Sequence, residues 1–155
     1  MTAYAELQCT TNFSFLRGAS HPEELVMQAK HLGLSALAVT DRNTLAGVVR
    51  AHGAAKDLGL KFIVGAELSL SSPQKLTREE GVSLLAYPTT RAAYGRLCRL
   101  LSRGQLRAKK AECILTLADL HEYAEGMIFA LLPESAEHLV SLRRTLKAPL
   151  YLAVH

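Results

Sequence analysis

The feature of this sequence that most constrains its fold is a repeated alternation of short apolar runs with longer amphipathic segments. Six of the runs have the length and the β-forming residues of strands. They are Tyr4–Cys9, Ser35–Val39, Lys61–Leu70, Val82–Tyr87, Met127–Leu132 and residues 150–154. Strands that alternate with helices at this spacing form β-α units, so the sequence predicts an α/β fold with a mainly parallel sheet.

Capping residues mark where the intervening helices begin and end. Ser20 and Glu23 have the spacing of a capping box, and Gly33 is placed to end the helix that follows them. The other helices are expected over Thr44–Leu58, from a Thr90 cap to about Gly104, after a Thr116–Asp119 capping box, and from Ser135 to before Pro149. The polar stretch Ser71–Gly81 carries turn residues and is expected to connect two strands.

The length and composition fit one globular domain over residues 1–155. Its strands suit either a small open sheet or the first part of a larger barrel, because a closed barrel must pair its first strand with its last. No apolar run approaches the roughly 20 residues of a membrane span, and the first residues lack the pattern of a secretion signal. The cysteines Cys9, Cys98 and Cys113 lie far apart and form no C-x-x-C pair, which favours a reducing cytoplasm.

Side chains at the carboxyl ends of parallel strands are the first candidates for a functional site. Thr10, Thr11 and Asn12 follow the first strand, and Asp41 and Glu67 are the carboxylates at the later strand ends. Two converging carboxylates could hold a divalent metal. From the residues alone, a structural role is the better interpretation, because an aspartate after a strand usually caps the next helix and a lone strand glutamate is usually partly exposed.

A basic segment stands out against the rest of the chain. Arg91–Lys110 contains seven basic residues and no acidic one, which leaves 11 basic against 14 acidic residues elsewhere. A solvated helix face is the commoner explanation of such a pattern, and contact with nucleic-acid phosphate or an acidic protein is the functional one. The side chains that would contact an anion are Arg96, Arg99, Arg103, Arg107, Lys109 and Lys110.

Three blocks of sequence together resemble a known family. "NFSFLRGAS", "TDRNTLAGVVRAH" and "LLAYPTTRAAYGRLCRLLSRG" are similar to the N-terminal PHP (polymerase and histidinol phosphatase) domain of bacterial C-family DNA polymerases, in the form of the error-prone, translesion branch. The resemblance spans essentially the whole chain. It implies the first part of a distorted β/α barrel of about seven strands with metal ligands at the strand tips. The palm, fingers and clamp-binding regions of such a polymerase would be absent from residues 1–155.

The metal-binding motifs of the family can be followed position by position in this chain. The alternating histidines of the first strand fall at Glu6, Gln8 and Thr10, and none of these is a histidine. The motif Thr-Asp-His-Gly corresponds to Thr40-Asp41-Arg42-Asn43, so the aspartate remains and the histidine is replaced. The later glycine-glutamate motif survives as Gly65-Ala66-Glu67. The further histidine expected near the fourth strand is absent as well, since Gly81 and Val82 stand there.

These replacements predict a degenerate metal site. A phosphoesterase centre needs several imidazoles and carboxylates, whereas the guanidinium of Arg42 brings a permanent positive charge. We expect no catalytic residue and no bound cofactor. If a Zn²⁺, Mn²⁺ or Mg²⁺ ion binds at all, Asp41 and Glu67 are its expected ligands. An ion pair of Arg42 with Asp41 or Glu67 is expected to replace the metal.

The resemblance implies a non-catalytic scaffold within a cytoplasmic DNA-directed DNA polymerase of damage tolerance and repair. Its partners would be the remainder of the polymerase chain, DNA and other translesion-synthesis proteins, with no membrane. One alternative is an active metal-dependent phosphoesterase or 3′–5′ exonuclease, which needs Asp41, Glu67 and Glu6 to converge. Another is a nucleic-acid or protein binding module that uses the basic segment 91–110.

Overall fold

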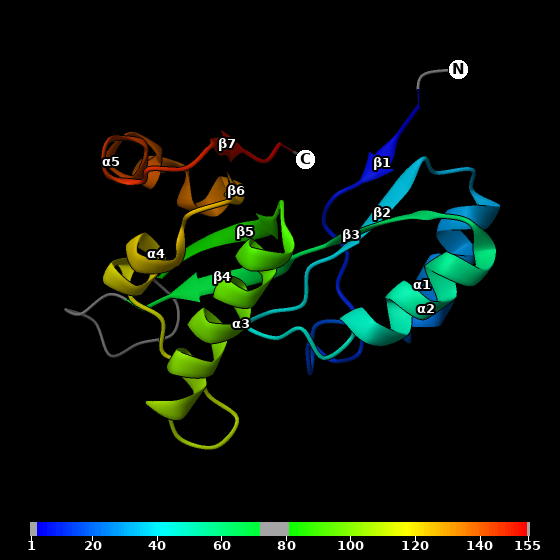
Figure 1. The fold of residues 1–155 in the computed structure, drawn as a ribbon, viewed down its shortest axis with the longest axis horizontal. Helices are drawn as coiled ribbons and strands as arrows, with labels where there is room; N and C mark the ends of the chain where they lie inside the picture. The colour runs from blue at the N-terminus through cyan, green and yellow to red at the C-terminus, as the bar shows by residue number, and fades with distance from the viewer. Residues whose placement is uncertain (1–2, 72–80, 155) are drawn as a thin grey trace. The chain divides into compact units, whose positions relative to one another are not determined.

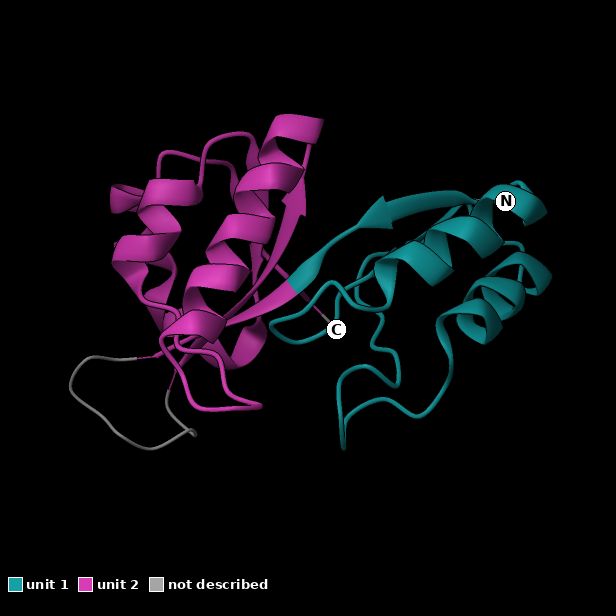
Figure 2. Ribbon diagram, turned by 60° about the horizontal axis from the view of Figure 1, so that its bottom comes forward, with its two compact units in different colours: residues 1–66 teal, residues 67–155 magenta. Residues whose placement is uncertain are grey.

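The structure, a computed structural model, describes residues 3–71 and 81–154. The polar stretch expected to connect two strands lies almost entirely outside these residues. The chain divides into two compact units, residues 1–66 and residues 67–155, and each is described by itself (Figure 2).

The first unit is a parallel sheet of three strands joined by helices. Its strands β1 (Ala5–Glu6), β2 (Ala36–Val39) and β3 (Lys61–Val64) lie in that order, and both neighbouring pairs are parallel. The connections are α1 (Pro22–His31) and α2 (Val48–Leu58), which pack side by side (Figure 1). The β-α-β-α-β order expected from the sequence is therefore confirmed for this unit.

The core of the first unit forms between the helices and the central strand. Every residue of β2 is buried, as expected for a strand with neighbours on both edges and helices packed on it. The buried cluster joins one face of each helix to the sheet and consists of Val26, Ala29, Leu37, Val39, Ala51, Ala55 and Leu60. Gly59 ends α2 in the left-handed conformation, with φ of 63°, which a glycine adopts without strain.

The second unit contains a sheet in the order β4-β5-β6-β7. Its strands are β4 (Ala66–Leu70, beginning at the boundary), β5 (Val82–Pro88), β6 (Met127–Leu131) and β7 (Leu150–Leu152). Its helices are α3 (Arg91–Leu106), α4 (Leu117–Tyr123), the 3₁₀ helix η1 (Pro133–His138) and α5 (Leu139–Thr145). Phe129 of β6 is 1% exposed, and leucines of β4, β5 and α3 are buried as well.

Two expectations about the strands are wrong in detail. The expected third strand, Lys61–Leu70, is two strands of different sheets, because the chain leaves the first ladder at Gly65, whose N–H donates to the Val39 carbonyl at 3.1 Å. The pair β5 and β6 is antiparallel, whereas β6 and β7 are parallel. Two helices separate β5 from β6, and the chain re-enters the sheet at the end where β5 finishes, since Pro88 pairs with Met127.

Two of the helices begin at other residues than the sequence predicts. The N-cap of α1 is His21, whose N–H donates to Glu24 at 2.7 Å, because Ser20 is tied to the preceding loop through its carbonyl. Helix α2 begins at Val48 instead of Thr44, after a turn in which Asn43 has a φ of 52°. The expected caps of α3 at Thr90 and of α4 at Thr116 with Asp119 are confirmed.

Helix α3 packs against the segment that leads into α4. Its apolar face buries Leu97, Leu100 and Leu101, as the spacing of the leucines predicts. Gly104 allows the close approach, since a Cβ there would lie 2.5 Å from a methyl carbon of Leu115. Among the described residues, no helix is long and apolar enough to cross a bilayer.

Candidate functional site

The motif aspartate lies at the carboxyl end of β2 and is almost completely buried. Asp41 is 1% exposed, and its carboxylate accepts three hydrogen bonds from the loop that follows β1. Oδ1 accepts from the Thr11 N–H at 2.8 Å and from the Ser14 hydroxyl at 2.7 Å. Oδ2 accepts from the Thr11 hydroxyl at 2.7 Å. The expectation that Asp41 caps the next helix is therefore wrong. Its carboxylate oxygens accept hydrogen bonds from this loop, and α2 has no side-chain cap.

The direction of each hydrogen bond in this cluster is fixed by the backbone. The Arg42 N–H donates to Ser14 Oγ at 2.9 Å, and the Phe13 N–H donates to Thr11 Oγ1 at 3.1 Å. Each hydroxyl thus accepts a hydrogen bond from a backbone amide and donates one to the Asp41 carboxylate. The cluster needs a group at position 41 that only accepts, which is what an ionised carboxylate is.

The backbone of Gly47 closes the side of the carboxylate next to Oδ2. A Cβ at this position would lie 2.8 Å from Asp41 Oδ2 and 3.0 Å from Thr11 Oγ1. Gly47 has a φ of −77°, so the glycine is favoured here by space and not by backbone conformation. The buried carboxylate is therefore enclosed by donors and by main chain.

The positions of the absent first-strand histidines lie on β1 and just after it. Glu6 belongs to β1, and its carboxylate accepts from the Gln8 N–H at 2.9 Å and from the Tyr4 hydroxyl at 3.0 Å. This hydrogen bond to Glu6, together with the negative charge of its carboxylate, raises the pKa of the exposed Tyr4 phenol. Gln8 and Thr10 are half-buried in the segment after the strand. The Glu6 carboxylate thus accepts hydrogen bonds from neighbouring residues of its own segment.

The half-buried thiol of Cys9 lies between these positions. Burial, and after it the negative charges of Glu6 and Asp41, raise its pKa to about 11. A thiol with so high a pKa is protonated at neutral pH and is a poor nucleophile or metal ligand.

The donor set does not fit the metal that the family implies. Asp41 Oδ1 already has two hydrogen-bond donors, and a cation placed there would face the same donor hydrogens. Within residues 3–71 and 81–154, no three His, Cys, Asp or Glu side chains are grouped so that they could hold a metal ion. We therefore derive no chemical step through a metal.

The last two candidate positions are Arg42 and Glu67. Glu67 lies in β4 and is 6% exposed, so the expectation of a partly exposed strand residue is wrong. It belongs to the second unit, whereas Asp41 and Arg42 belong to the first. The ion pair of Arg42 with either carboxylate stays a prediction.

The basic segment forms α3 and the turn after it, and much of its charge is paired within the second unit. Arg96 contacts Glu125 at 2.7 Å, and Arg103 forms an ion pair with Glu122 while its guanidinium lies 4.9 Å from the Tyr123 ring centroid. Arg107 binds Asp119 through two hydrogen bonds, at 2.7 and 2.9 Å. These carboxylate partners are not predictable from the sequence, although all lie in the acidic segment 119–125.

Asp119 is the centre of this set of ion pairs. Burial alone would raise its pKa, but hydrogen bonds from Arg107 and Thr116 outweigh burial and hold the pKa at about 2. The carboxylate also accepts from the Thr116 N–H at 2.9 Å, so Asp119 belongs to the capping box of α4 and also binds Arg107, which directly follows α3. The arginines on this side of α3 therefore stabilise the packing of the two helices.

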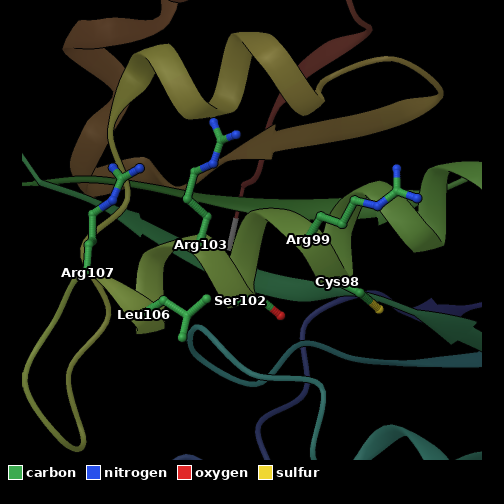
Figure 3. A pocket seen from close by; sticks show the side chains of 6 residues that line it. All are labelled: Cys98, Arg99, Ser102, Arg103, Leu106 and Arg107. Atoms are coloured by element: carbon green, nitrogen blue, oxygen red, sulfur yellow. The ribbon is translucent and has the colours of Figure 1, made fainter.

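A shallow hollow of about 500 Å³ lies along α3 (Figure 3). It is lined by Cys98, Arg99, Ser102, Arg103, Leu106 and Arg107. In Figure 3, Arg103 and Arg107 extend toward α4, where their carboxylate partners lie. Arg99, Lys109 and Lys110 are exposed. Contact of this face with DNA stays a prediction.

The loop residues that bind Asp41 are the functional positions that sequence reasoning identified least well. Thr11 follows the first strand and was a candidate by position, but Ser14 was not. Both are buried, at 0% and 4% exposed. The available signal was the run of hydroxyl and amide side chains in "TTNFS", which gives no partner for them.

Comparison with known proteins agrees with the resemblance. Residues 6–148 match the family model for the PHP domain. The chain is 51% identical over 146 residues to Error-prone DNA polymerase 1 of Agrobacterium fabrum and 47% identical over 156 residues to Error-prone DNA polymerase of Caulobacter vibrioides. These matches cover 94% and 97% of this chain but only 13% and 14% of the relatives.

Solved structures show the same fold at low sequence identity. A putative metal-dependent phosphoesterase from Bifidobacterium adolescentis aligns with a TM-score of 0.64 at 15% identity, covering 86% of this chain and 68% of its own. An amidohydrolase from Chromobacterium violaceum aligns with a TM-score of 0.70 at 15% identity, covering 96% and 76%. The α/β architecture expected of a PHP-type barrel is thereby confirmed. The chain belongs to the PHP domain family, and within that family it is similar to the PHP domains of error-prone DNA polymerases.

Proposed function

We propose that this chain is the PHP portion of an error-prone DNA polymerase and serves there as a non-catalytic structural domain. The observation that carries the proposal is the state of Asp41, whose carboxylate is buried and hydrogen-bonded to Thr11 and Ser14. The replacement of the family's histidines by Glu6, Gln8, Thr10 and Arg42 supports the same conclusion. Nucleotidyl transfer would belong to other parts of such a polymerase.

The wider role follows from the relatives and is part of the same proposal. A polymerase of this kind copies damaged DNA, so the domain would work in DNA repair and translesion synthesis in the cytoplasm. Its direct partner would be the remainder of the polymerase chain, with other translesion-synthesis proteins nearby. DNA would be a partner of the exposed cations Arg99, Lys109 and Lys110 on and after α3.

An activity assay of the purified chain tests the proposal. We expect no hydrolysis of bis-p-nitrophenyl phosphate and no 3′–5′ degradation of single-stranded DNA with Mn²⁺, Zn²⁺ or Mg²⁺, above the rate of an Asp41→Ala variant. The reason is that no imidazole is available at the motif positions to hold a metal and lower the pKa of its water. Hydrolysis that requires a metal and is abolished by Asp41→Ala would favour the phosphoesterase alternative.

A further inference from the structure

We propose that Asp41 has exchanged metal binding for a structural role, in which its carboxylate anchors the loop of residues 11–18. The inference deepens the proposed function, because it names what the retained motif aspartate does when no metal is bound. Thr11 and Ser14 take the place of a cation as the groups that satisfy the buried negative charge.

The loop of residues 11–18 contains several exposed side chains. Phe15 is 85% exposed and Leu16 is 90% exposed, and Arg17 is exposed as well. Leu16 also has a φ of 62°, a left-handed conformation that is unfavourable for a leucine. Neither apolar burial nor backbone preference therefore explains the shape of the loop.

Several polar contacts of the loop involve Ser14. Its N–H donates to the Thr11 carbonyl at 3.0 Å, and its own carbonyl accepts from the N–H groups of Arg17 at 2.9 Å and Gly18 at 3.1 Å. Ser14 is held in place by its hydroxyl, which bonds Asp41 Oδ1 and the Arg42 N–H. The turn between Ser14 and Gly18 is thus connected to the aspartate through the Ser14 side chain.

The end of the loop returns to its start, where Gly18 lies against the backbone of Thr11. Gly18 lies so close to the start of the loop that a Cβ there would be 2.1 Å from the Thr11 carbonyl oxygen. Thr11 is in turn fixed by two hydrogen bonds to Asp41, one from its N–H and one from its hydroxyl. Both ends of the turn are therefore connected to one buried carboxylate.

Limited trypsin digestion followed by mass spectrometry tests this role, because Arg17 is a cleavage site within the loop. In EDTA, we expect Asp41→Asn to be cut after Arg17 about tenfold faster than the unaltered chain, since the amide cannot accept all three hydrogen bonds. Cleavage after Arg50, in α2, should change much less. Asp57→Asn is the matched control, because Asp57 is exposed at the end of α2, and it should change neither rate.

Two results would overturn the anchor. One is an unchanged rate at Arg17 in Asp41→Asn. The other is protection of Arg17 that the unaltered chain loses in EDTA and regains with Zn²⁺ or Mn²⁺, which would make Asp41 a metal ligand. Should Asp41→Asn speed cleavage at Arg17 and Arg50 equally, Ser14→Ala decides the matter, since it keeps the carboxylate and must still expose Arg17. The assay in EDTA is independent of hydrolytic activity, so the anchor and the proposed function can fail separately.

Discussion

Replacement of Asp41 by alanine is expected to lower the free energy of unfolding by about 3 to 5 kcal/mol, the range seen when one partner of a buried charged network is removed. The substitution leaves the Thr11 N–H and the hydroxyls of Thr11 and Ser14 without their acceptor in a buried place. Each such donor costs roughly 1 to 3 kcal/mol unless the loop rearranges. Urea denaturation followed by circular dichroism measures the change.

The sign of this change in the free energy of unfolding distinguishes a structural cluster from an empty metal centre. Carboxylates gathered for a metal repel one another when the metal is removed, so alanine at such a position tends to stabilise the metal-free protein. In this chain we expect the opposite in EDTA. Asp57→Ala is the control and should stay within about 0.5 kcal/mol, as surface substitutions usually do. A loss below about 1 kcal/mol for Asp41→Ala would contradict the account.

Replacement of Asp119 by alanine is expected to cost about 2 to 4 kcal/mol, because it removes the paired hydrogen bonds to Arg107 and the capping box of α4 together. The same residue makes stability depend on acid. The folded-state pKa of about 2 lies below the ordinary value of 3.8, so the contribution is present above pH 3.8 and is lost as the pH falls toward 2.

Denaturation at about pH 5 and about pH 3 measures this dependence. The unaltered chain should lose up to about 1 kcal/mol of this contribution between the two, with allowance for the solvent around Arg107, while Asp119→Asn should lack that part of the change. Glu125→Ala is the matched control, since Glu125 pairs with Arg96 on α3 but is 80% exposed, and we expect less than about 0.5 kcal/mol. Equal effects of Asp119→Ala and Glu125→Ala would refute the central place of Asp119.

Local signals in the sequence were sufficient for most of the secondary structure. The run at β2, the caps at Thr90 and Thr116, and the end of α2 at Gly59 each rest on residues close in the chain. The break at Gly65 was not predictable in this way, because "KFIVGAELSL" keeps a strand-forming composition on both sides. Which sheet each half joins is decided by tertiary packing, which no local pattern reports.

The absence of the metal-binding histidines was predictable from the sequence, but the hydrogen-bond partners of Asp41 were not. The absent histidines could be read directly at Glu6, Gln8, Thr10 and Arg42. The partners of Asp41 lie 27 to 30 residues away, at Ser14 and Thr11, and nothing in the spacing joins them. The same holds for Arg107, which directly follows α3, and Asp119 in α4, which are 12 residues apart. Hydroxyl and charged side chains have many potential partners, and only the fold selects one.

The central claim is that the retained motif aspartate belongs to a hydrogen-bonded cluster instead of a metal centre. The most direct measurement is the metal content of the purified chain after exposure to excess Zn²⁺ or Mn²⁺ and removal of unbound ions. The account predicts far less than one metal ion per chain, and the same small amount in Asp41→Ala. One ion per chain that Asp41→Ala abolishes would contradict it.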